Sequence, residues 1–231
     1  MRRIGSGGVC GRIAQSEPSA FAQRLEAIFD PGGGWKPSWN IGPTATVLGV
    51  REFRDQRRLQ VFRWGLVPGG MKDPATGARS FNARAETVAT KPTFRAAFRR
   101  RRLLVPVDGF YEWQATPGAA KKTPHFFSRA DGDVLVLAGL WEYWKADDRE
   151  IRSATVITTA AGPDIEGIHD RQPVVLEPDH WERWLDPELE DRDELEGMLS
   201  AGAGVLRHWP VGSDVGNVGN DRPDLVARVA G

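Results

Sequence analysis

The stretch HFFSRADGDVLVLAGLWEYW, residues 125–144, indicates the fold more clearly than any other part of the chain. Two runs rich in β-branched and aromatic residues, His125–Arg129 and Val134–Trp144, flank the dipeptide Asp131-Gly132. A pair of such runs around Asp-Gly is typical of two strands joined by a tight hairpin turn. We therefore predict an antiparallel strand pair here.

Similar runs lie on both sides of this stretch, and a second hairpin loop is expected at Arg54–Arg57. The further strands are expected at Thr46–Phe53, Leu59–Val67, Leu103–Trp113, Ala154–Ala161 and Val174–Leu176. Strands joined by hairpins, with few crossover helices, indicate an α+β fold: a single domain built on a mainly antiparallel β-sheet with flanking helices. We expect this sheet to be curled or barrel-like.

Helical patterns are fewer than strand patterns. Ser16 with Pro18 just inside predicts a helix start, and that helix is expected to run to about Asp30. Its apolar stripe would be Ala20, Phe21, Leu25 and Ile28. Further helices are expected at Pro92–Arg100, Pro178–Leu185 and Asp191–Ala201.

The composition is that of a soluble globular protein, with 231 residues, 40% apolar and 27% charged. No apolar run reaches the roughly 20 residues of a membrane span, and the first eight residues lack the apolar region of a secretory signal. A single cysteine favours the reducing cytoplasm. The four histidines and that cysteine show no zinc-ligand spacing, so we expect no metal and no other cofactor.

Charge is balanced overall, with 31 basic and 31 acidic residues, but unevenly distributed. Residues 95–102 hold a cluster of arginines, whereas residues 186–196 are acidic. Nine tryptophans are many for this length. Surplus tryptophan can form core or can offer a stacking surface for nucleic-acid bases.

The only cysteine, Cys10, lies in Val9-Cys10-Gly11-Arg12. A lone cysteine is more often buried and structural than reactive. Its position near the start of the chain, before the first helix, suggests that little core surrounds it. We therefore interpret Cys10 as the reactive centre.

Polar residues in three other segments are candidates for a site. Asn82 and Arg84 lie in a polar loop between a strand and a helix, where the amide could orient a substrate and the guanidinium could hold a phosphate. Strand alternation places Glu112 on the same face as Phe110, as either an exposed strand residue or a desolvated acid–base group. His169, in a loop, is either surface or a positioned proton carrier.

Two features have weaker claims to a functional role. The other histidines, at 125, 180 and 208, are interpreted as structural. The Gly/Asn turn at residues 215–220 could offer backbone N–H groups to a phosphate.

Together these segments resemble the SRAP family, the SOS-response-associated peptidases or abasic-site processing proteins. The resemblance lies in seven segments in the family's order: residues 10–12 (CGR), 39–44 (WNIGPT), 64–68 (WGLVP), 81–87 (FNARAET), 108–113 (DGFYEW), 168–173 (IHDRQP) and 215–218 (VGNV). It implies a β-rich SRAP domain with a positively charged groove for single-stranded DNA. It also implies covalent capture of abasic sites by an N-terminal cysteine.

By matched position the resemblance implies that Cys10 is the nucleophile, surrounded by Asn82, Glu112 and His169. It implies a phosphate contact at Arg84. The set of residues expected to contact DNA is Arg12, Asn40, Trp64, Gly65, Pro68, Arg84, Trp113, Arg171 and Asn217. We expect single-stranded DNA with abasic sites as the partner, no membrane, and a monomer that acts in the cytoplasm and on the nucleoid.

The chemistry requires an N-terminal cysteine. A free α-amine condenses with the aldehyde of a ring-opened abasic site, and the thiol of the same residue then closes a thiazolidine. We expect Glu112 to move protons at the amine and thiol, His169 to assist ring opening, and Asn82 to orient the amine or the sugar oxygen. The thiol is expected to be activated by nearby groups. The imine also permits β-elimination, which predicts a weak strand-cleaving lyase activity.

Residues 1–9 depart from the family pattern, in which cysteine directly follows the initiator methionine. While they remain, the nitrogen of Cys10 is an amide. Either Val9 is a valine-coded start, or the extension is cut off, for example by the protein itself, or it stays and the protein is inactive on DNA. We expect the first, so that residues 1–9 are an extension and residues 10–231 form the SRAP domain.

Two other functions are weighed against this one. Cys10, His169 and Asn82 would form a Cys–His–Asn set in a thiol peptidase, which needs no free amine. Alternatively, tryptophan and arginine side chains would make a non-covalent single-stranded DNA binding module in which Cys10 is incidental.

Overall fold

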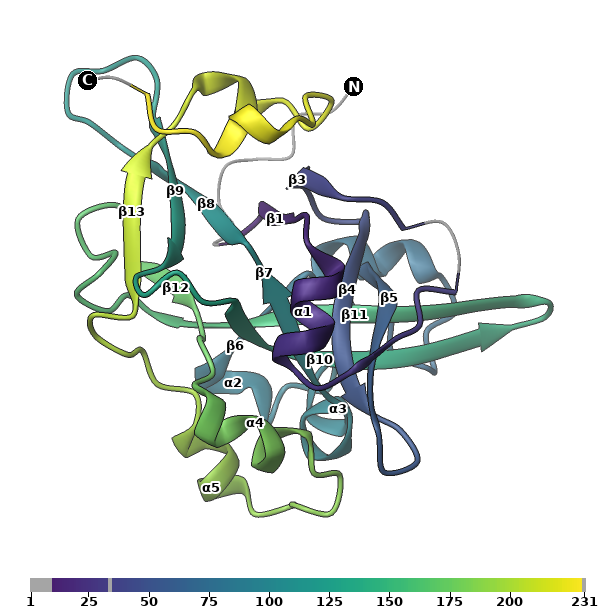
Figure 1. Cartoon of the computed structure of the whole chain (residues 1–231). Helices are drawn as coiled ribbons and strands as arrows, with labels where there is room; N and C mark the ends of the chain where they lie inside the picture. The colour runs from purple at the N-terminus through teal and green to yellow at the C-terminus, as the bar shows by residue number, and fades with distance from the viewer. Residues whose placement is uncertain (1–9, 33–34, 230–231) are drawn as a thin grey trace.

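The computed structural model describes residues 10–32 and 35–229, which form two β-sheets and several short helices (Figure 1). The predicted extension, residues 1–9, lies outside the described residues.

Five strands close into a barrel. They are β4 (Thr46–Glu52), β5 (Arg57–Trp64), β7 (Arg102–Val107), β10 (Leu135–Ala146) and β11 (Arg149–Ala160). Antiparallel pairing runs in the order β11-β10-β7-β4-β5, and parallel pairing of β5 with β11 closes the ring. Three short strands extend it, namely β2 (Ile28–Phe29), β6 (Asn82–Arg84) and β12 (Arg171–Pro173). The predicted α+β fold with a barrel-like, mainly antiparallel sheet is confirmed.

A second, antiparallel sheet of five strands packs beside the barrel (Figure 1). Its order is β13 (Leu206–Pro210), β9 (Thr123–Arg129), β8 (Gly109–Gln114), β1 (Ile13–Gln15) and β3 (Ser38–Ile41). Of these, β1, β3 and β13 were not predicted, because strands of three to five residues carry too little alternation to be recognised.

Two predictions about strand connections are wrong, because in each of these segments the chain passes from one sheet to the other. The predicted strand Leu103–Trp113 breaks at Asp108, so that β7 lies in the barrel and β8 in the second sheet. Gly109 permits this crossing, since a Cβ there would lie 2.2 Å from the carbonyl oxygen of Phe127. Asp131-Gly132 does form a turn, but the strands on either side, β9 and β10, belong to different sheets and do not pair.

The hairpin loop predicted at Arg54–Arg57 is confirmed, because β4 and β5 pair up to Glu52 and Arg57. Arg54 and Asp55 have φ of 52° and 58°, the pair of left-handed conformations found in a type I′ turn.

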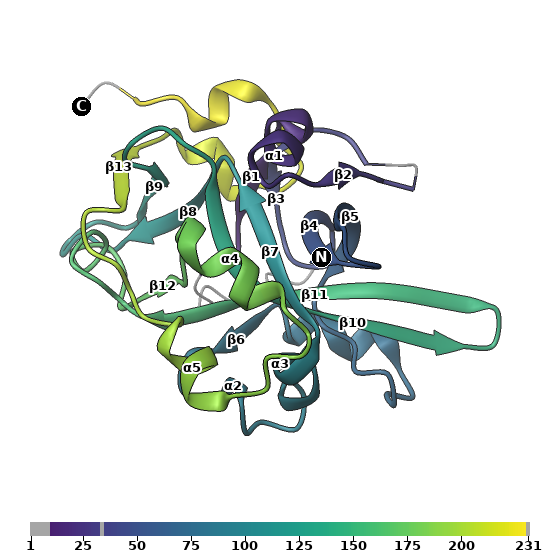
Figure 2. The ribbon, with the colours of Figure 1, turned by 60° about the horizontal axis from the view of Figure 1, so that its bottom comes forward.

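The helices are short and cover one side of the barrel (Figure 2). They are α1 (Pro18–Arg24), α2 (Ala85–Val88), α3 (Arg95–Arg100), α4 (Pro178–Leu185) and α5 (Arg192–Gly197), with 3₁₀ turns at Pro74–Arg79, Ser213–Gly216 and Pro223–Val226. The prediction for α4 is confirmed to the residue, whereas α3 and α5 are shorter than predicted. The first helix does not reach Asp30: Glu26 has φ of 50°, which ends it, and Ile28 lies in β2 instead. The strand predicted at Val174–Leu176 is wrong: β12 (Arg171–Pro173) lies just before these residues, and Val175 forms only an isolated bridge to Leu137.

Strand alternation divides the apolar core between the two faces of the barrel sheet. On one face the core joins barrel residues such as Leu48 and Leu104 to the helices α1, α3, α4 and α5. On the other face it joins Val47 and Val105 to the second sheet, and this cluster includes Cys10. The second sheet therefore covers the face of the barrel that the helices leave open, and Cys10 lies where the two sheets meet.

Candidate active site

Cys10 is fully buried, in a turn just before β1. The expectation that little core surrounds it is wrong: it packs in the apolar cluster between the two sheets. Its φ of 49° lies in the left-handed region, which is costly for a residue with a Cβ. Strain of this kind is common at functional sites.

Glu112 in β8 lies directly against Cys10. The backbone N–H of Cys10 donates to Oε1 of Glu112 over 2.5 Å, and Glu112 is only 3% exposed. Burial raises the pKa of Glu112 from 4.5 to about 7. The predicted alternation is confirmed, since Phe110 packs with Cys10 whereas Tyr111 and Trp113 pack in a separate cluster. Of the two interpretations of Glu112, the buried, desolvated carboxyl is the one found.

His169 approaches the other oxygen of the same carboxyl. Its Nε2 lies 3.9 Å from Oε2 of Glu112, and its Nδ1 lies 2.9 Å from Oδ1 of Asp170. Gln114, at the end of β8, donates to the carbonyl of Gly167 and so ties this loop to the strand that carries Glu112. Burial lowers the pKa of His169, so the neutral ring is favoured at neutral pH.

Asn82 and Arg84 lie in β6, which pairs in parallel with β11. Register places Asn82 beside Val156, which is part of the cluster around Cys10, and Arg84 beside Thr158. The side chain of Arg84 is exposed and that of Asn82 is half-buried. The structure therefore brings three predicted residues into one chain of contacts, from Cys10 through Glu112 to His169, and places Asn82 on a neighbouring strand.

The thiol of Cys10 is not activated. Burial, and then the charge of Glu112, raise its pKa well above the ordinary value. Apolar surroundings disfavour the thiolate while the nitrogen of Cys10 is an amide. The expectation of an activated thiol concerns a free N-terminal cysteine and stays a prediction. The buried carboxyl of Glu112 contacts the nitrogen of Cys10 rather than its sulfur.

Three residues predicted to contact DNA lie in one internal network. Nη1 of Arg12 donates to Oδ1 of Asn40 (2.7 Å) and to the carbonyl of Val215 (2.5 Å). Nδ2 of Asn40 donates to the carbonyls of Val215, Asn217 and Asn220. These bonds hold the Gly/Asn turn against β1 and β3, so Arg12 and Asn40 shape the surface there; their contact with DNA stays a prediction.

The segment predicted to border DNA at Trp64–Pro68 is mostly internal. Trp64 is fully buried and donates from its indole to the carbonyl of Phe81, so its ring cannot stack on a base. Gly65 is buried with φ of 130°. Pro68 is half-buried and lines a surface pocket with Trp141, Arg101 and Glu142.

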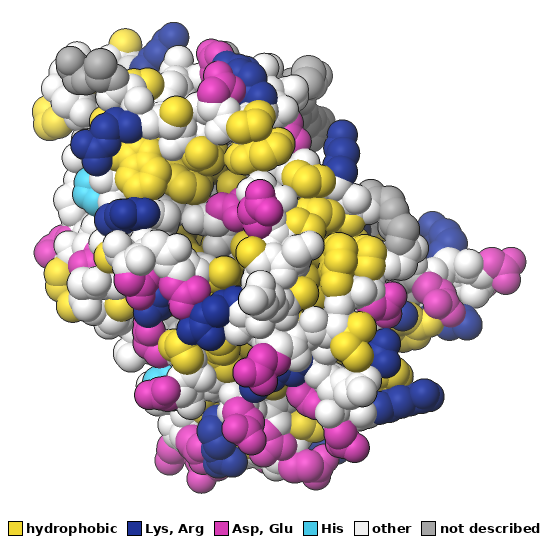
Figure 3. Space-filling view, in the orientation of Figure 1, with side chains coloured by type: hydrophobic (Ala, Val, Ile, Leu, Met, Phe, Trp, Pro, Cys, Tyr) yellow, Lys and Arg dark blue, Asp and Glu magenta, His cyan; other side chains and the backbone are white. Residues whose placement is uncertain are grey.

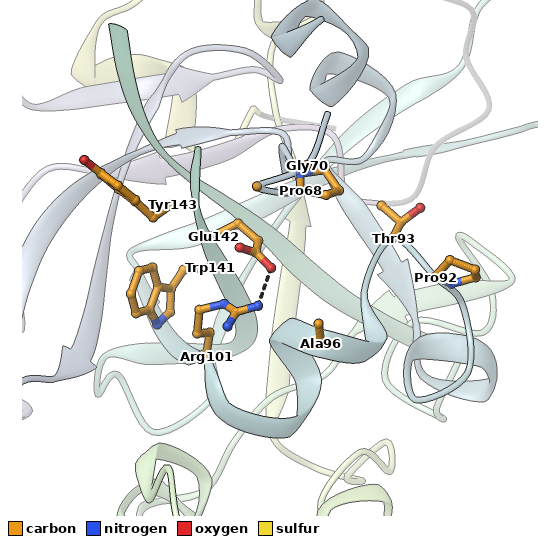
Figure 4. A pocket seen from close by; sticks show the side chains of 10 residues that line it. Pro68, Gly70, Pro92, Thr93, Ala96, Arg101, Trp141, Glu142 and Tyr143 are labelled. Carbon is orange, nitrogen blue, oxygen red and sulfur yellow. Dashed lines mark hydrogen bonds and ion pairs between the residues drawn. The ribbon is translucent and has the colours of Figure 1, made fainter. Parts of the chain in front are cut away.

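Figure 4 shows that in this pocket Arg101 and Glu142 point toward each other, joined by an ion pair of 2.5 Å. Neither charge is therefore without a partner. The residues that line the pocket do not include Cys10, Glu112 or His169. The half-buried ring of Trp141 and the exposed ring of Tyr143, which also line it, were not singled out in the sequence.

The other residues predicted to contact DNA differ in their exposure and in whether their side chains already have partners within the protein. Trp113 is half-buried at the end of β8, with the guanidinium of Arg12 5.7 Å from its ring. Asn217 is exposed. Arg171 is held by Glu86 through both terminal nitrogens.

Four arginines of the cluster at residues 95–102, namely Arg99, Arg100, Arg101 and Arg102, have partners within the fold. Arg99 and Arg100 both bind Glu190 of the acidic segment. Arg102 is buried and caps backbone carbonyls. Figure 3 shows basic and acidic side chains interspersed over one face of the molecule, with acidic ones dense around α4 and α5.

Tryptophan is used mainly as core. Of the nine, four are buried (Trp64, Trp144, Trp181 and Trp184) and five are half-buried (Trp35, Trp39, Trp113, Trp141 and Trp209). Only the half-buried rings have an edge that could meet a base.

Within residues 10–32 and 35–229, no group of three or more His, Cys, Asp or Glu side chains is placed to hold a metal ion. In the same part of the chain, no helix is both long and apolar enough to cross a membrane.

Comparisons with known proteins give the family of the chain. The chain matches the family described as SOS response associated peptidase (SRAP) over residues 9–218. It is 34% identical to the abasic site processing protein YoqW of Bacillus subtilis, over 94% of this chain and 99% of that protein. It is 31% identical to the abasic site processing protein YedK of Escherichia coli, over 96% of this chain and all of that protein.

A crystal structure of a protein from Bacteroides thetaiotaomicron has the same fold, with a TM-score of 0.85 and 22% identity, covering 96% of this chain and all of that one. The motifs, the Cys10–Glu112–His169 contacts and the match over most of the length lead to one conclusion: the chain belongs to the SRAP family and has a role in abasic-site processing.

Proposed function

We propose that the processed form of this protein, which begins at Cys10, binds single-stranded DNA and captures the aldehyde of an abasic site as a thiazolidine. The observation that carries the proposal is the bond from the nitrogen of Cys10 to the buried carboxyl of Glu112. An acid–base group at that nitrogen is suited to amine chemistry, in which the nitrogen must lose protons.

The reaction begins at the amine. The α-ammonium of Cys10 gives a proton to the carboxylate of Glu112, and the free amine adds to the aldehyde carbon. Loss of one water gives the imine, with the proton for the leaving hydroxyl coming from Glu112 or His169. The thiol then adds across the imine: Sγ bonds to carbon and the sulfur's proton passes to nitrogen. The raised thiol pKa fits this order, because sulfur enters as a neutral thiol after the imine has formed.

The pKa of Glu112 suits a group that both accepts and donates. At about 7 it is divided between its two forms near neutral pH. That value applies while the nitrogen of Cys10 is an amide; an α-ammonium at the same position would lower the pKa of Glu112. His169, 3.9 Å from the second oxygen, supplies or removes the proton that Glu112 exchanges, and assists opening of the sugar ring.

Cleavage before Cys10 is required for this chemistry, because an amide nitrogen forms no imine. The family match begins at residue 9, and we propose that residues 1–9 are absent from the active form, which is then the SRAP domain from residue 10. Loss of the acyl group also removes the φ constraint at Cys10, because φ is defined only when a residue precedes it.

An autopeptidase activity would use the same contact. Sγ of Cys10 would add to the carbonyl carbon of the preceding residue, and the thiol proton would pass through the carboxyl of Glu112 to the leaving nitrogen. Water would then hydrolyse the thioester, which releases the preceding segment as a carboxylic acid and restores the thiol. A general thiol peptidase is disfavoured, since a buried thiol with a raised pKa supplies little thiolate.

DNA binding in this proposal relies on exposed groups around the site, chiefly the guanidinium of Arg84 and the edge of Trp113. Contact with phosphates would make binding salt-sensitive and independent of sequence. A lyase activity follows from the imine: loss of the 2′ proton and of the 3′ phosphate oxygen cleaves the strand in competition with ring closure by sulfur.

The test is denaturing electrophoresis with protein that begins at Cys10, its start checked by intact mass. We expect a heat-stable adduct with abasic single-stranded DNA and none with intact DNA. Cys10→Ser keeps the amine and removes the sulfur, so it should give an adduct only when the imine is trapped with borohydride. Equal binding to intact and abasic strands without any adduct would support the non-covalent module, and a stable adduct from Cys10→Ser would contradict the thiazolidine.

A further inference from the structure

We infer that the end of the barrel away from Cys10 carries a second contact for single-stranded nucleic acid, in which Arg51, Arg58 and Arg152 bind phosphate groups and neighbouring aromatic rings stack on bases. We call it the Arg51 site. It involves no covalent chemistry, so the inference goes beyond the proposed function and does not depend on it.

The Arg51 site lies at the opposite end of the barrel strands from Cys10. Val47 and Arg51 lie on the same face of β4, but only Val47 belongs to the apolar cluster around Cys10. Their separation of four residues corresponds to about 13 Å along the strand. Arg58 pairs with Arg51 across β4 and β5, and Arg152 comes from β11. Three strands of the barrel therefore bring arginines to this end.

The guanidinium of Arg51 is held in place while its outer nitrogens stay accessible. Arg51 is only 9% exposed, and its guanidinium lies 4.6 Å from the ring of Phe53 and 4.8 Å from that of Trp141. Its Nε donates to Oε1 of Gln60 over 2.8 Å, and Gln60 in turn donates to Asp30. In the described part of the chain, neither Nη of Arg51 has a hydrogen-bond acceptor, and neither is enclosed away from solvent. The two Nη atoms therefore leave a planar fork free to bind an anion.

Positive charge is in excess around this guanidinium. Burial, and then the charges of Arg152 and Arg58, lower the pKa of Arg51, whereas the charge of Asp30 raises it by less than either arginine lowers it. Asp30 lies 3.8 Å from Nη1 of Arg58. Glu150, near Arg152 on β11, is bound by a lysine of β10. An added anion would relieve the repulsion among the three arginines, which favours binding of a negatively charged ligand.

Exposed aromatic rings beside these arginines favour nucleic acid over an acidic peptide as that ligand. Phe53 is 37% exposed and Tyr143 is 39% exposed, whereas Trp141 is half-buried. In Figure 4 the rings of Trp141 and Tyr143 lie on the opposite side of β10 from Glu142, and register places Tyr143 beside Arg152. Guanidinium groups next to exposed rings are typical of single-strand binding, in which the cation binds phosphate and the ring stacks on a base. Carboxylates of a peptide would use the arginines but not the rings.

The test replaces the two accessible arginines, because Arg51 is packed between rings and its loss could disturb the fold. Affinity of the full chain for an undamaged single strand of about 30 nucleotides is measured by fluorescence anisotropy over a range of salt concentrations. We expect the double variant Arg58→Gln, Arg152→Gln to lower the log–log salt slope by about 1.4, which is about 0.7 for each lost phosphate contact. At 0.1 M salt this corresponds to a loss of affinity of about 25-fold.

The matched control is the double variant Arg99→Gln, Arg183→Gln. It removes the same charge from α3 and α4, where these side chains are 63% and 51% exposed. We expect it to change affinity by less than about twofold and to leave the salt slope unaltered, because two phosphate contacts are not lost. Thermal unfolding of both double variants establishes that each is folded.

Replacing the rings separates nucleic acid from an acidic peptide. Phe53→Ala and Tyr143→Ala should each weaken binding by about fivefold or more without changing the salt slope, because stacking is lost while the phosphate contacts remain. If the arginine variant lowers affinity but neither ring variant does, the assignment to nucleic acid is wrong and an acidic peptide fits the site better. If the folded arginine variant keeps the affinity and salt slope of the unsubstituted protein, the arginines serve only the packing of the barrel and the inference is overturned. No adduct forms in these measurements, so their outcome is independent of the capture test.

Discussion

Replacing Glu112 with glutamine should remove a pH-dependent cost of burying a carboxylate. Glu112 is buried beside Cys10, and its pKa rises from 4.5 to about 7 on folding. The native state therefore binds the proton more tightly than the unfolded state between these pH values, and stability falls as pH rises through that window. Below about pH 4.5 the carboxyl is protonated in both states and this cost vanishes.

The magnitude follows from the two values. The difference between 7 and 4.5, at about 1.4 kcal/mol per pH unit, corresponds to about 3 kcal/mol. Glutamine is nearly isosteric and keeps an acceptor for the N–H of Cys10, but it does not titrate. The stability of Glu112→Gln relative to the unsubstituted protein should thus increase by about 3 kcal/mol from pH 4.5 to pH 7 and level off above.

Urea unfolding of the two proteins in parallel, at half-unit steps from pH 4.5 to 8.5, measures this difference. Contributions common to both proteins cancel, among them that of Asp108, whose pKa burial raises to about 6. If the difference in unfolding free energy between the two proteins stays constant within about 0.5 kcal/mol from pH 4.5 to 8.5, the reasoning that burial of Glu112 raises its pKa is refuted.

Three further predictions concern the fold. Arg102→Met should lower the free energy of unfolding by about 3 kcal/mol in urea titration, because it leaves the carbonyls of Phe98 and Trp184 without their buried donor; a loss below 1 kcal/mol would contradict this role. Gly109→Ala should cost about 3 kcal/mol by thermal or urea unfolding, since its Cβ would overlap a backbone oxygen, and an unchanged Tm would be incompatible with the crossing between sheets described above. Asp55→Gly should stabilise by about 0.5–1 kcal/mol in the same assay, because glycine adopts φ of 58° without strain; destabilisation would mean that the turn is not type I′.

Several parts of the fold were predictable from local pattern. The hairpin at Arg54–Arg57 and the helix Pro178–Leu185 follow from turn chemistry and from apolar spacing, and both are found as predicted. The break at Asp108 was not predictable, because residues 103–113 keep the composition of one strand. What divides them is a close approach of Gly109 to Phe127, which lies 18 positions further along the chain.

For the site, motifs in the sequence suggested the candidate residues, and the fold determined their burial and their contacts. Cys10, Glu112 and His169 could be proposed from motifs, and they are found in contact. Burial of Cys10 could not be predicted, since it depends on the meeting of two sheets whose strands come from distant segments. That burial raises the pKa of the thiol, because the energy of an ionised group depends on the medium around it.

The sequence by itself determined the family, the β-rich class and the candidate residues, because these follow from local order along the chain. Only the tertiary structure decided which polar groups are free. Arg171 binds Glu86, Arg99 and Arg100 bind Glu190, and the nitrogen of Cys10 binds Glu112. Each of these pairs joins residues more than 80 positions apart, and a guanidinium or an amide has the same appearance in the sequence whether its partner is solvent, DNA or a carboxylate of its own chain.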